Sequence, residues 1–212
     1  MSRNLEPSAN RMARFYEKVA FDREFAGFGT SLAGMDEAGR GPLLGPVVAA
    51  CVILPESPLI TWVDDSKKLS PSRREALFNQ IMGEAVHVGV GQASAREIDK
   101  LNILGATKLA MMRAGLNAPA ALCLVDAVRD FELPFPIHSV IHGDVLSYHI
   151  AAASIIAKVT RDRMLREMDR KYPVYGLASN KGYGTAVHIE AIRQHGPTPE
   201  HRMSFIRRFL QE

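Results

Sequence analysis

The sequence predicts an α/β fold with a helical C-terminal extension. Short apolar runs of strand length fill the first two thirds of the chain, two long helical patterns accompany them, and no strand-like run follows residue 141. The chain has 212 residues, of which 47% are hydrophobic and 23% are charged. A chain of this length and composition buries a sizeable core without disulfide or metal staples and is typical of one globular domain with a small appendage.

The first half of the chain alternates strands and helices. The apolar run Val47–Leu54 predicts a buried strand, and the shorter run Leu32–Asp36 is expected to pair with it across a turn rich in glycine and proline. A helix is predicted to begin at Pro71, because proline suits the first helical turn and Ser70 precedes it as an N-cap. The other predicted elements here are a lead-in helix over residues 7–25 and a third strand over residues 85–92.

The second half of the chain predicts two more strands and mainly helices. Apolar residues recur at helical spacing from Ile150 to Met168, so one long helix is predicted from Ser147 to Lys171. The remaining predictions are helical segments over residues 95–115, strands over 121–126 and 137–141, and a helix over 185–195. We expect a lead-in helix (1–27), an α/β core (28–160) and a helical C-terminal extension (161–212).

Composition excludes several classes of protein. No apolar run approaches the roughly 18 residues of a membrane span, and the first residues lack the apolar core of a signal peptide, so a cytoplasmic protein is expected. Cys51 and Cys123 each lie within an apolar stretch. Buried, unpaired thiols in a reducing compartment are therefore predicted.

The net charge of +3 is unevenly distributed along the chain. Residues 158–212 carry a net charge of +5, whereas residues 1–157 carry −2. A basic segment on a slightly acidic body suggests an anionic partner such as nucleic acid. A solvated basic helix explains the same pattern equally well.

Carboxylates are predicted at the ends of three strands. Asp36 and Glu37 follow the first strand, Asp126 the fourth and Asp144 the fifth. Carboxylates that converge repel one another unless a cation compensates, and hard oxygen ligands favour Mg²⁺ or Mn²⁺. Two such ions are the standard apparatus of phosphodiester hydrolysis. Spacing alone leaves open that Asp144 caps the long helix and that Asp36 and Asp126 are turn residues.

Two motifs of the sequence are highly specific: AGMDEAGRGPLLGPV at residues 33–47 and AAASIIAKVTRDR at residues 151–163. In these motifs, and from about residue 12 to residue 209 as a whole, the sequence resembles the type 2 ribonuclease H family of bacterial type, ribonuclease HII. Shorter matches follow the same order: DSKKL at 65–69, NI at 102–103, LVD at 124–126, GD at 143–144, KGYGT at 181–185 and HRMSF at 201–205.

The resemblance implies a ribonuclease H-like five-stranded mixed sheet flanked by helices. It also implies a metal site for two Mn²⁺ or Mg²⁺ ions on four acids: Asp36, Glu37, Asp126 and Asp144. Asp36 is the best candidate to bridge both ions. The implied substrates are RNA·DNA hybrids and DNA duplexes with embedded ribonucleotides, cut 5′ of a ribonucleotide to leave a 5′-phosphate and a 3′-hydroxyl. Ribonucleotide excision repair and RNA primer removal are the implied roles.

The resemblance further implies substrate contacts. Gly39, Arg40 and Gly41 correspond to a loop that senses the 2′-hydroxyl, since glycine permits close backbone approach, although the same residues suit a plain hairpin turn. Tyr183 corresponds to an aromatic residue that lies against a deoxyribose; a partly buried loop tyrosine is the alternative. The expected phosphate contacts are Lys67, Lys68, Lys158, Arg161 and Lys181.

Other interpretations are less favoured. A non-catalytic binder of hybrids would need a broken set of acids, and a resolvase or integrase would lack the Gly-Arg-Gly and Lys-Gly-Tyr-Gly-Thr motifs. Type 3 relatives carry an extra N-terminal platform domain, for which about 30 residues before Asp36 are too few. The histidines His188, His195 and His201 are interpreted as structural. No obligate protein partner is evident, and a monomer is expected.

Overall fold

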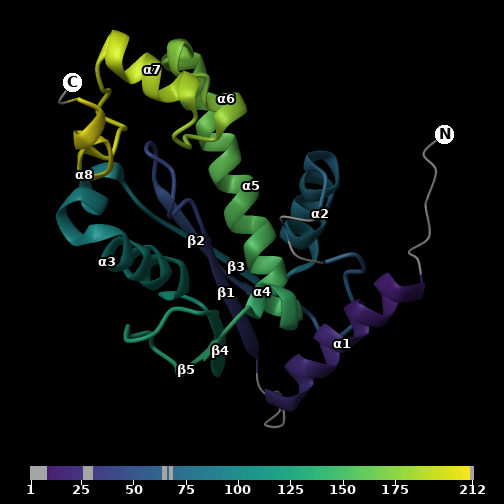
Figure 1. Ribbon diagram of the computed structural model, residues 1–212. Helices are drawn as coiled ribbons and strands as arrows, with labels where there is room; N and C mark the ends of the chain where they lie inside the picture. The colour runs from purple at the N-terminus through teal and green to yellow at the C-terminus, as the bar shows by residue number, and fades with distance from the viewer. Residues whose placement is uncertain (1–8, 26–30, 64–65, 67–68, 211–212) are drawn as a thin grey trace.

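Five strands form one mixed sheet in the order β3-β2-β1-β4-β5 in the computed structural model, which describes residues 9–25, 31–63, 66 and 69–210 (Figure 1). The strands are β1 (Leu32–Ala38), β2 (Val47–Ile53), β3 (His87–Ala93), β4 (Leu122–Asp126) and β5 (Ile137–Val140). β2 is antiparallel to both of its neighbours, β1 and β3, whereas β4 runs parallel to β1 and β5 parallel to β4. The predicted fold class is confirmed.

Helices cover both faces of the sheet. They are α1 (Ala9–Phe25), α2 (Pro71–Glu84), α3 (Ala95–Gly115), α4 (Gly143–Leu146), α5 (Tyr148–Lys171), α6 (Leu177–Asn180), α7 (Ala186–His195) and α8 (Met203–Ile206), with 3-10 turns at Pro173–Tyr175 and Arg207–Phe209. In the described part of the chain, none of these helices is long and apolar enough to cross a membrane.

The alternation of β2 distributes its side chains between two cores. Ala50 and Val52 pack with α5 on one face of the sheet, and Cys51 and Ile53 pack with α3 on the other. Every residue of β2 is buried as a result, which is why its sequence reads as a continuous apolar run. Cys51 and Cys123 are buried free thiols, as predicted.

The start of α5 lies directly against β1. Ser147 caps the helix, since its hydroxyl accepts a hydrogen bond from the amide of Ile150. A Cβ atom on Gly34 would lie 2.1 Å from the backbone carbon of His149, so only glycine allows this approach. The contact brings the strand that carries Asp36 and the region around Asp144 close together.

The C-terminal helices pack around the far end of α5 and against the loop between β1 and β2 (Figure 1). Leu43 and Leu44 from this loop share a buried cluster with Leu165, Leu177 and residues further along the chain. The predicted division at residue 161 lies within α5, and the three-part organisation of the chain stays a prediction.

Two local features differ from the prediction. β1 continues to Ala38, so Asp36 and Glu37 lie inside the strand and not after it; its pairing with β2 extends to Ala38, whereas its pairing with β4 ends at Met35. Helix α3 is kinked at Asn102, where φ is 59°, because the Asn102 side chain accepts from two following amides and starts a second helical segment.

Candidate active site

Three carboxylates meet at one edge of the sheet. Asp36, Asp126 and Asp144 each offer an oxygen atom, and these atoms all lie within 4.8 Å of one another. Met35 pairs with Val125 in the parallel register, so Asp36 and Asp126 are the next residues on two neighbouring strands. Asp144 reaches the same place from the short helix α4, which follows β5. The predicted convergence of these acids is therefore present in the structure.

The polypeptide holds these acids by backbone contacts. The amide of Gly143 donates to an Asp126 oxygen at 2.7 Å, and the amide of Glu37 donates to an Asp36 oxygen at 2.7 Å. Asp36 and Asp144 are buried, and Asp126 is half-buried. The alternative role of Asp144 as the cap of the long helix is wrong, because Ser147 caps α5 and Asp144 lies in a helix of its own.

The electrostatics of the cluster favour a bound cation. Burial raises the pKa of Asp36 well above its ordinary value, and the negative charges of Glu37 and Asp126 raise it further. Burial also raises the pKa of Glu37, although the Arg40 guanidinium at 3.4 Å opposes this. Ionised acids in this position therefore cost folding free energy that a divalent cation offsets.

Glu37 adds a fourth acid to the same cleft. One of its oxygens faces Arg40, while the other, Oε2, is buried and has no hydrogen-bond partner in the described part of the chain. Buried carboxylate oxygens are normally paired, so a free one beside three converging acids is the arrangement expected of a ligand. The residues present thus fit a hard divalent cation such as Mg²⁺ or Mn²⁺.

A cleft of about 340 Å³ is lined by Asp36, Glu37 and Asp126 and by several predicted substrate contacts. Its lining includes Gly39, Arg40, Gly41, Lys158 and Tyr183. The side chain of Lys158 pairs with Asp162 at 2.6 Å, and burial lowers its pKa. Lys67 and Lys68 lie outside the described residues.

Two serines in the cleft escaped sequence analysis. Ser154 hydrogen-bonds to the Asp36 side chain and its hydroxyl lies 2.9 Å from that of Ser66. Both serines are buried, and both line the cleft. A polar residue on the buried apolar face of the long helix is the sequence signal that could have pointed to Ser154.

Arg161 lines the same cleft, but its polar atoms bind backbone carbonyls of the protein. Its side chain is 1% exposed, and its guanidinium donates to the carbonyls of Leu44, Pro46 and Lys181 at 3.0–3.1 Å. It therefore joins the loop after β1 to the segment before Tyr183, and its phosphate contact stays a prediction. The Lys181 ammonium donates to the carbonyl of Ala178, and its side chain lines a separate hollow with residues of α2.

Arg202 holds the Gly-Arg-Gly loop from behind. It is fully buried and donates to the carbonyls of Gly39, Arg40, Pro42 and Gly45 at 2.6–2.9 Å. Burial lowers its pKa to about 9, so it remains charged at neutral pH. The loop that faces the cleft is thus shaped by a residue from the C-terminal end of the chain, which sequence analysis did not single out.

Tyr183 is 50% exposed at the mouth of the cleft, and its ring lies opposite Gly41. A chain of hydrogen bonds fixes its backbone. The amide of Thr198 donates to Nδ1 of His201, so His201 carries its proton on Nε2 and donates to Nε2 of His188 at 3.2 Å. His188 then donates from Nδ1 to the carbonyl of Tyr183 at 2.9 Å. Both histidines act as structural residues here.

This histidine pair makes folding stability depend on pH. Burial lowers the pKa of His201 from 6.5 to about 4 and also lowers that of His188. The folded state therefore binds fewer protons than the unfolded state, and stability that is complete above pH 6.5 is lost as the pH falls toward about 4. Between about pH 7 and about pH 5, we expect the free energy of unfolding of His201→Gln to fall by about 2 kcal/mol less than that of the wild type. Urea unfolding at about pH 7 and about pH 5 measures it.

The exposed His195 on α7 provides the control for this prediction. His195→Gln is expected to keep the wild-type dependence on pH, because the substitution leaves the buried pair of His188 and His201 intact. Identical pH dependence in the His201→Gln and His195→Gln proteins would contradict the assignment.

The sheet order and the converging carboxylates define the class of this protein: a ribonuclease H-like fold with an acid cluster that suits divalent metal ions. The family model described as "Ribonuclease HII" matches residues 33–208. The chain therefore belongs to the ribonuclease HII family and is a type 2 ribonuclease H, an enzyme that degrades the RNA of RNA–DNA hybrids.

Relatives and solved structures agree with this assignment. A ribonuclease HII of Acetivibrio thermocellus is 50% identical over 197 residues, which are 92% of this chain and 75% of the relative. A ribonuclease HII of Geobacillus kaustophilus is 53% identical over 195 residues, or 91% of this chain and 75% of the relative. The ribonuclease H2 of Pyrococcus horikoshii OT3 superposes with a TM-score of 0.72 at 27% identity, covering 86% of this chain and 100% of that one.

Proposed function

We propose that this protein cleaves the phosphodiester on the 5′ side of a ribonucleotide, within RNA·DNA hybrids and at single ribonucleotides in duplex DNA. The products are a 5′-phosphate and a 3′-hydroxyl. The observation that carries the proposal is the group of three carboxylate oxygens within 4.8 Å, of which those of Asp36 and Asp126 belong to residues that line one cleft with Gly41 and Tyr183. Removal of ribonucleotides from DNA and of RNA primers are the corresponding roles.

The four acids are the proposed ligands of two Mg²⁺ or Mn²⁺ ions. When bound, divalent ions make a water nucleophilic near neutral pH and stabilise charge on the departing 3′ oxygen. Asp36 has Glu37 and Asp126 as its charged neighbours, so it is the proposed bridging ligand, with Glu37 and Asp126 on one ion and Asp144 on the other. Ser154, which donates to Asp36, would orient that carboxylate.

The Gly-Arg-Gly loop and Tyr183 are the proposed readers of the ribonucleotide. The absence of a side chain at Gly41 would let a sugar approach the loop, whose backbone polar groups would pair with a 2′-hydroxyl, whereas a Cβ atom on Gly39 would clash with the Arg161 side chain. Arg40 is 45% exposed at the cleft and presents its donors to an adjacent phosphate. Tyr183 would lie flat against the next deoxyribose, where an additional 2′-hydroxyl would clash.

Tyr183→Ala is expected to lower kcat/KM on a single-ribonucleotide duplex by about 10- to 100-fold, the usual contribution of one aromatic stacking contact. The fold should be unchanged, because the side chain is half exposed. Tyr183→Phe keeps the ring and is expected to remain near the wild-type rate. Cleavage assays with circular dichroism spectra of both variants test this, and equal rates for the alanine and wild-type proteins would remove the stacking contact.

The proposed function is tested with a DNA duplex that contains one ribonucleotide, titrated with Mg²⁺ and with Mn²⁺. A nick 5′ of that ribonucleotide is expected, and an all-DNA duplex of the same sequence should stay intact. Absence of the nick in both metals contradicts the proposal. Cleavage of the all-DNA duplex would instead indicate a nuclease of resolvase type on the same fold.

We propose no obligate protein partner and a monomer as the active form. The archaeal relative from Archaeoglobus fulgidus, whose structure is described as a PCNA:RNase HII complex, is 26% identical over 82% of this chain, with a TM-score of 0.71.

Among the lysines that the structure describes, Lys158 lines the cleft, where it is proposed to contact a phosphate of the substrate. Contacts between a lysine and a phosphate release counterions from the nucleic acid, so the affinity for the substrate should fall as the salt concentration rises.

A further inference from the structure

Two oppositely charged side chains lie one turn apart on the inner face of α1. Lys18 is 3% exposed and Asp22 is 4% exposed, and residues four apart share one face of a helix. Both contact the junction between α4 and α5, directly after Asp144. The helix α1 precedes the residues 33–208 that match the family model.

Lys18 contacts the backbone that carries Asp144. Its ammonium donates to the carbonyl of Asp144 at 2.9 Å and to that of Val145 at 2.6 Å. A helix of four residues cannot satisfy the carbonyls at its own C-terminal end, and a cation there also complements the helix dipole. Because the amide of Gly143 at the other end is bonded to Asp126, α4 is held between the acid cluster and α1.

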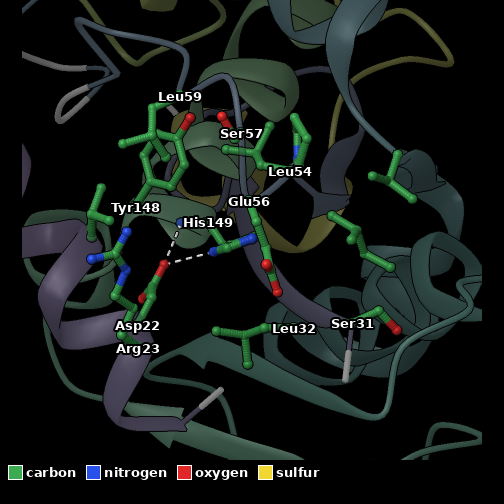
Figure 2. A pocket seen from close by; sticks show the side chains of 14 residues that line it. Asp22, Arg23, Ser31, Leu32, Leu54, Glu56, Ser57, Leu59, Tyr148 and His149 are labelled. Carbon is green, nitrogen blue, oxygen red and sulfur yellow. Dashed lines mark hydrogen bonds and ion pairs between the residues drawn. The ribbon is translucent and has the colours of Figure 1, made fainter. Parts of the chain in front are cut away.

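Asp22 contacts the start of α5 in a complementary way. One of its oxygens accepts from the backbone amide of His149 at 2.9 Å and from the ring Nδ1 of His149 at 2.7 Å, the two dashed contacts in Figure 2. The amide of His149 is one of the first-turn donors that have no acceptor within the helix, and Ser147 takes the next one. A carboxylate at this end of α5 is favoured by the helix dipole.

Beside these contacts α1 is loosely packed. A cavity of about 600 Å³ is lined by residues of α1, by the segment that follows β2 and by the start of α5 (Figure 2). Val19, Asp22 and Arg23 contribute to its wall from α1. Apolar burial is therefore incomplete on this side of the helix, and the polar contacts of Lys18 and Asp22 have a larger share in fixing its position.

We propose that α1 is a clamp on the active site and that Lys18 is a positioning residue for Asp144. The inference rests on the proposed role of Asp144 as a metal ligand. Without the Lys18 ammonium, the short helix α4 shifts and carries the Asp144 carboxylate away from Asp36 and Asp126. This loss weakens ion binding and lowers kcat, whereas KM for the duplex stays unchanged because the substrate loop lies elsewhere.

The test compares Lys18→Met, which keeps the buried volume, with Arg14→Met on the exposed side of the same helix. The dissociation constant of Mn²⁺ is measured without nucleic acid, from the electron paramagnetic resonance signal of the free ion. Lys18→Met is expected to raise this dissociation constant about tenfold, because the loss of a residue that orients a metal ligand weakens metal binding by about that factor. Arg14→Met is expected to leave the dissociation constant unchanged. Circular dichroism checks the fold, and Lys18→Gln, which keeps one donor, replaces Lys18→Met if that protein does not fold.

Asp144→Asn and the double variant separate the possible outcomes. If Lys18 acts through Asp144, Lys18→Met adds no further loss of Mn²⁺ affinity in the Asp144→Asn protein. If Lys18→Met lowers the Mn²⁺ affinity equally in the wild-type and the Asp144→Asn proteins, or in neither of them, the clamp is overturned. If Asp144→Asn itself binds Mn²⁺ like the wild type, the metal assignment fails and the clamp with it. If Asp144→Asn weakens binding and Lys18→Met does not, only the clamp fails.

Discussion

Asp36→Asn is expected to reduce hydrolysis by at least about 10³-fold, because Asp36 is the proposed bridging ligand of ions that would supply several kcal/mol of transition-state stabilisation. The substitution preserves the shape of the side chain, and its amide oxygen still accepts the amide proton of Glu37. Binding of the duplex should therefore persist. Single-turnover cleavage of a duplex with one ribonucleotide measures the loss, and a rate within tenfold of the wild type would contradict the bridging role.

The same variant is expected to be more stable than the wild type when no metal is present. The pKa of Asp36 is raised above its ordinary value of 3.8 by burial and by two neighbouring acids. Ionised Asp36 therefore destabilises the folded state; this cost is absent below pH 3.8 and complete above the raised folded-state pKa. The difference in free energy of unfolding between the variant and the wild type should grow as the pH rises through this window.

Urea unfolding in the presence of a chelator measures this difference. Asp130→Asn is the matched control, because Asp130 is exposed and has a φ of 58°, a conformation that asparagine tolerates well. Added Mn²⁺ should stabilise the wild type and the control and have little effect on Asp36→Asn. Equal stability of the two variants at every pH would show that the acid cluster stores no unfavourable charge.

Arg202→Lys is expected to lower the free energy of unfolding by about 3 kcal/mol or more, although it conserves the charge. The guanidinium donates to four carbonyls of the loop after β1, and a lysine ammonium at the same place cannot reach them all. The hydrogen bonds to the carbonyls of Pro42 and Gly45 are buried, so leaving these two acceptors unpaired is costly. Cleavage of single-ribonucleotide duplexes should fall together with stability, because the Gly-Arg-Gly loop loses its support.

Arg207→Lys, at an exposed arginine of the same C-terminal segment, is the control. It should unfold at the wild-type concentration of urea and cleave at the wild-type rate. If Arg202→Lys behaves like this control, the buried guanidinium does not shape the loop.

Much of the fold was predictable from the chain alone, because each strand carries its own apolar signal and each long helix its own periodicity. The observed strands begin and end within a few residues of the predicted ones. Helix α4 could not be predicted, since four residues are too short to show a helical period. The extent of β1 was also out of reach, because it depends on pairing with β2 and not on the residues of β1 themselves.

The acids of the site were predictable from type and position, whereas their support was not. A carboxylate at a strand end suggests its chemistry by its identity. Arg161 and Arg202 instead bind backbone carbonyls, which every residue has, so no pattern of residue types in the partner segment indicates them. For the same reason the basic character of Arg161 suggested a phosphate contact, while the structure places it inside the protein.

The anchoring of the Gly-Arg-Gly loop by Arg202 has a consequence for biosynthesis. The loop leaves the ribosome early, but its anchor lies 163 residues later than Gly39. A nascent chain that has already formed the sheet therefore still lacks the support of this loop. The loop can reach its folded shape only after Arg202 has been synthesised and has left the ribosome.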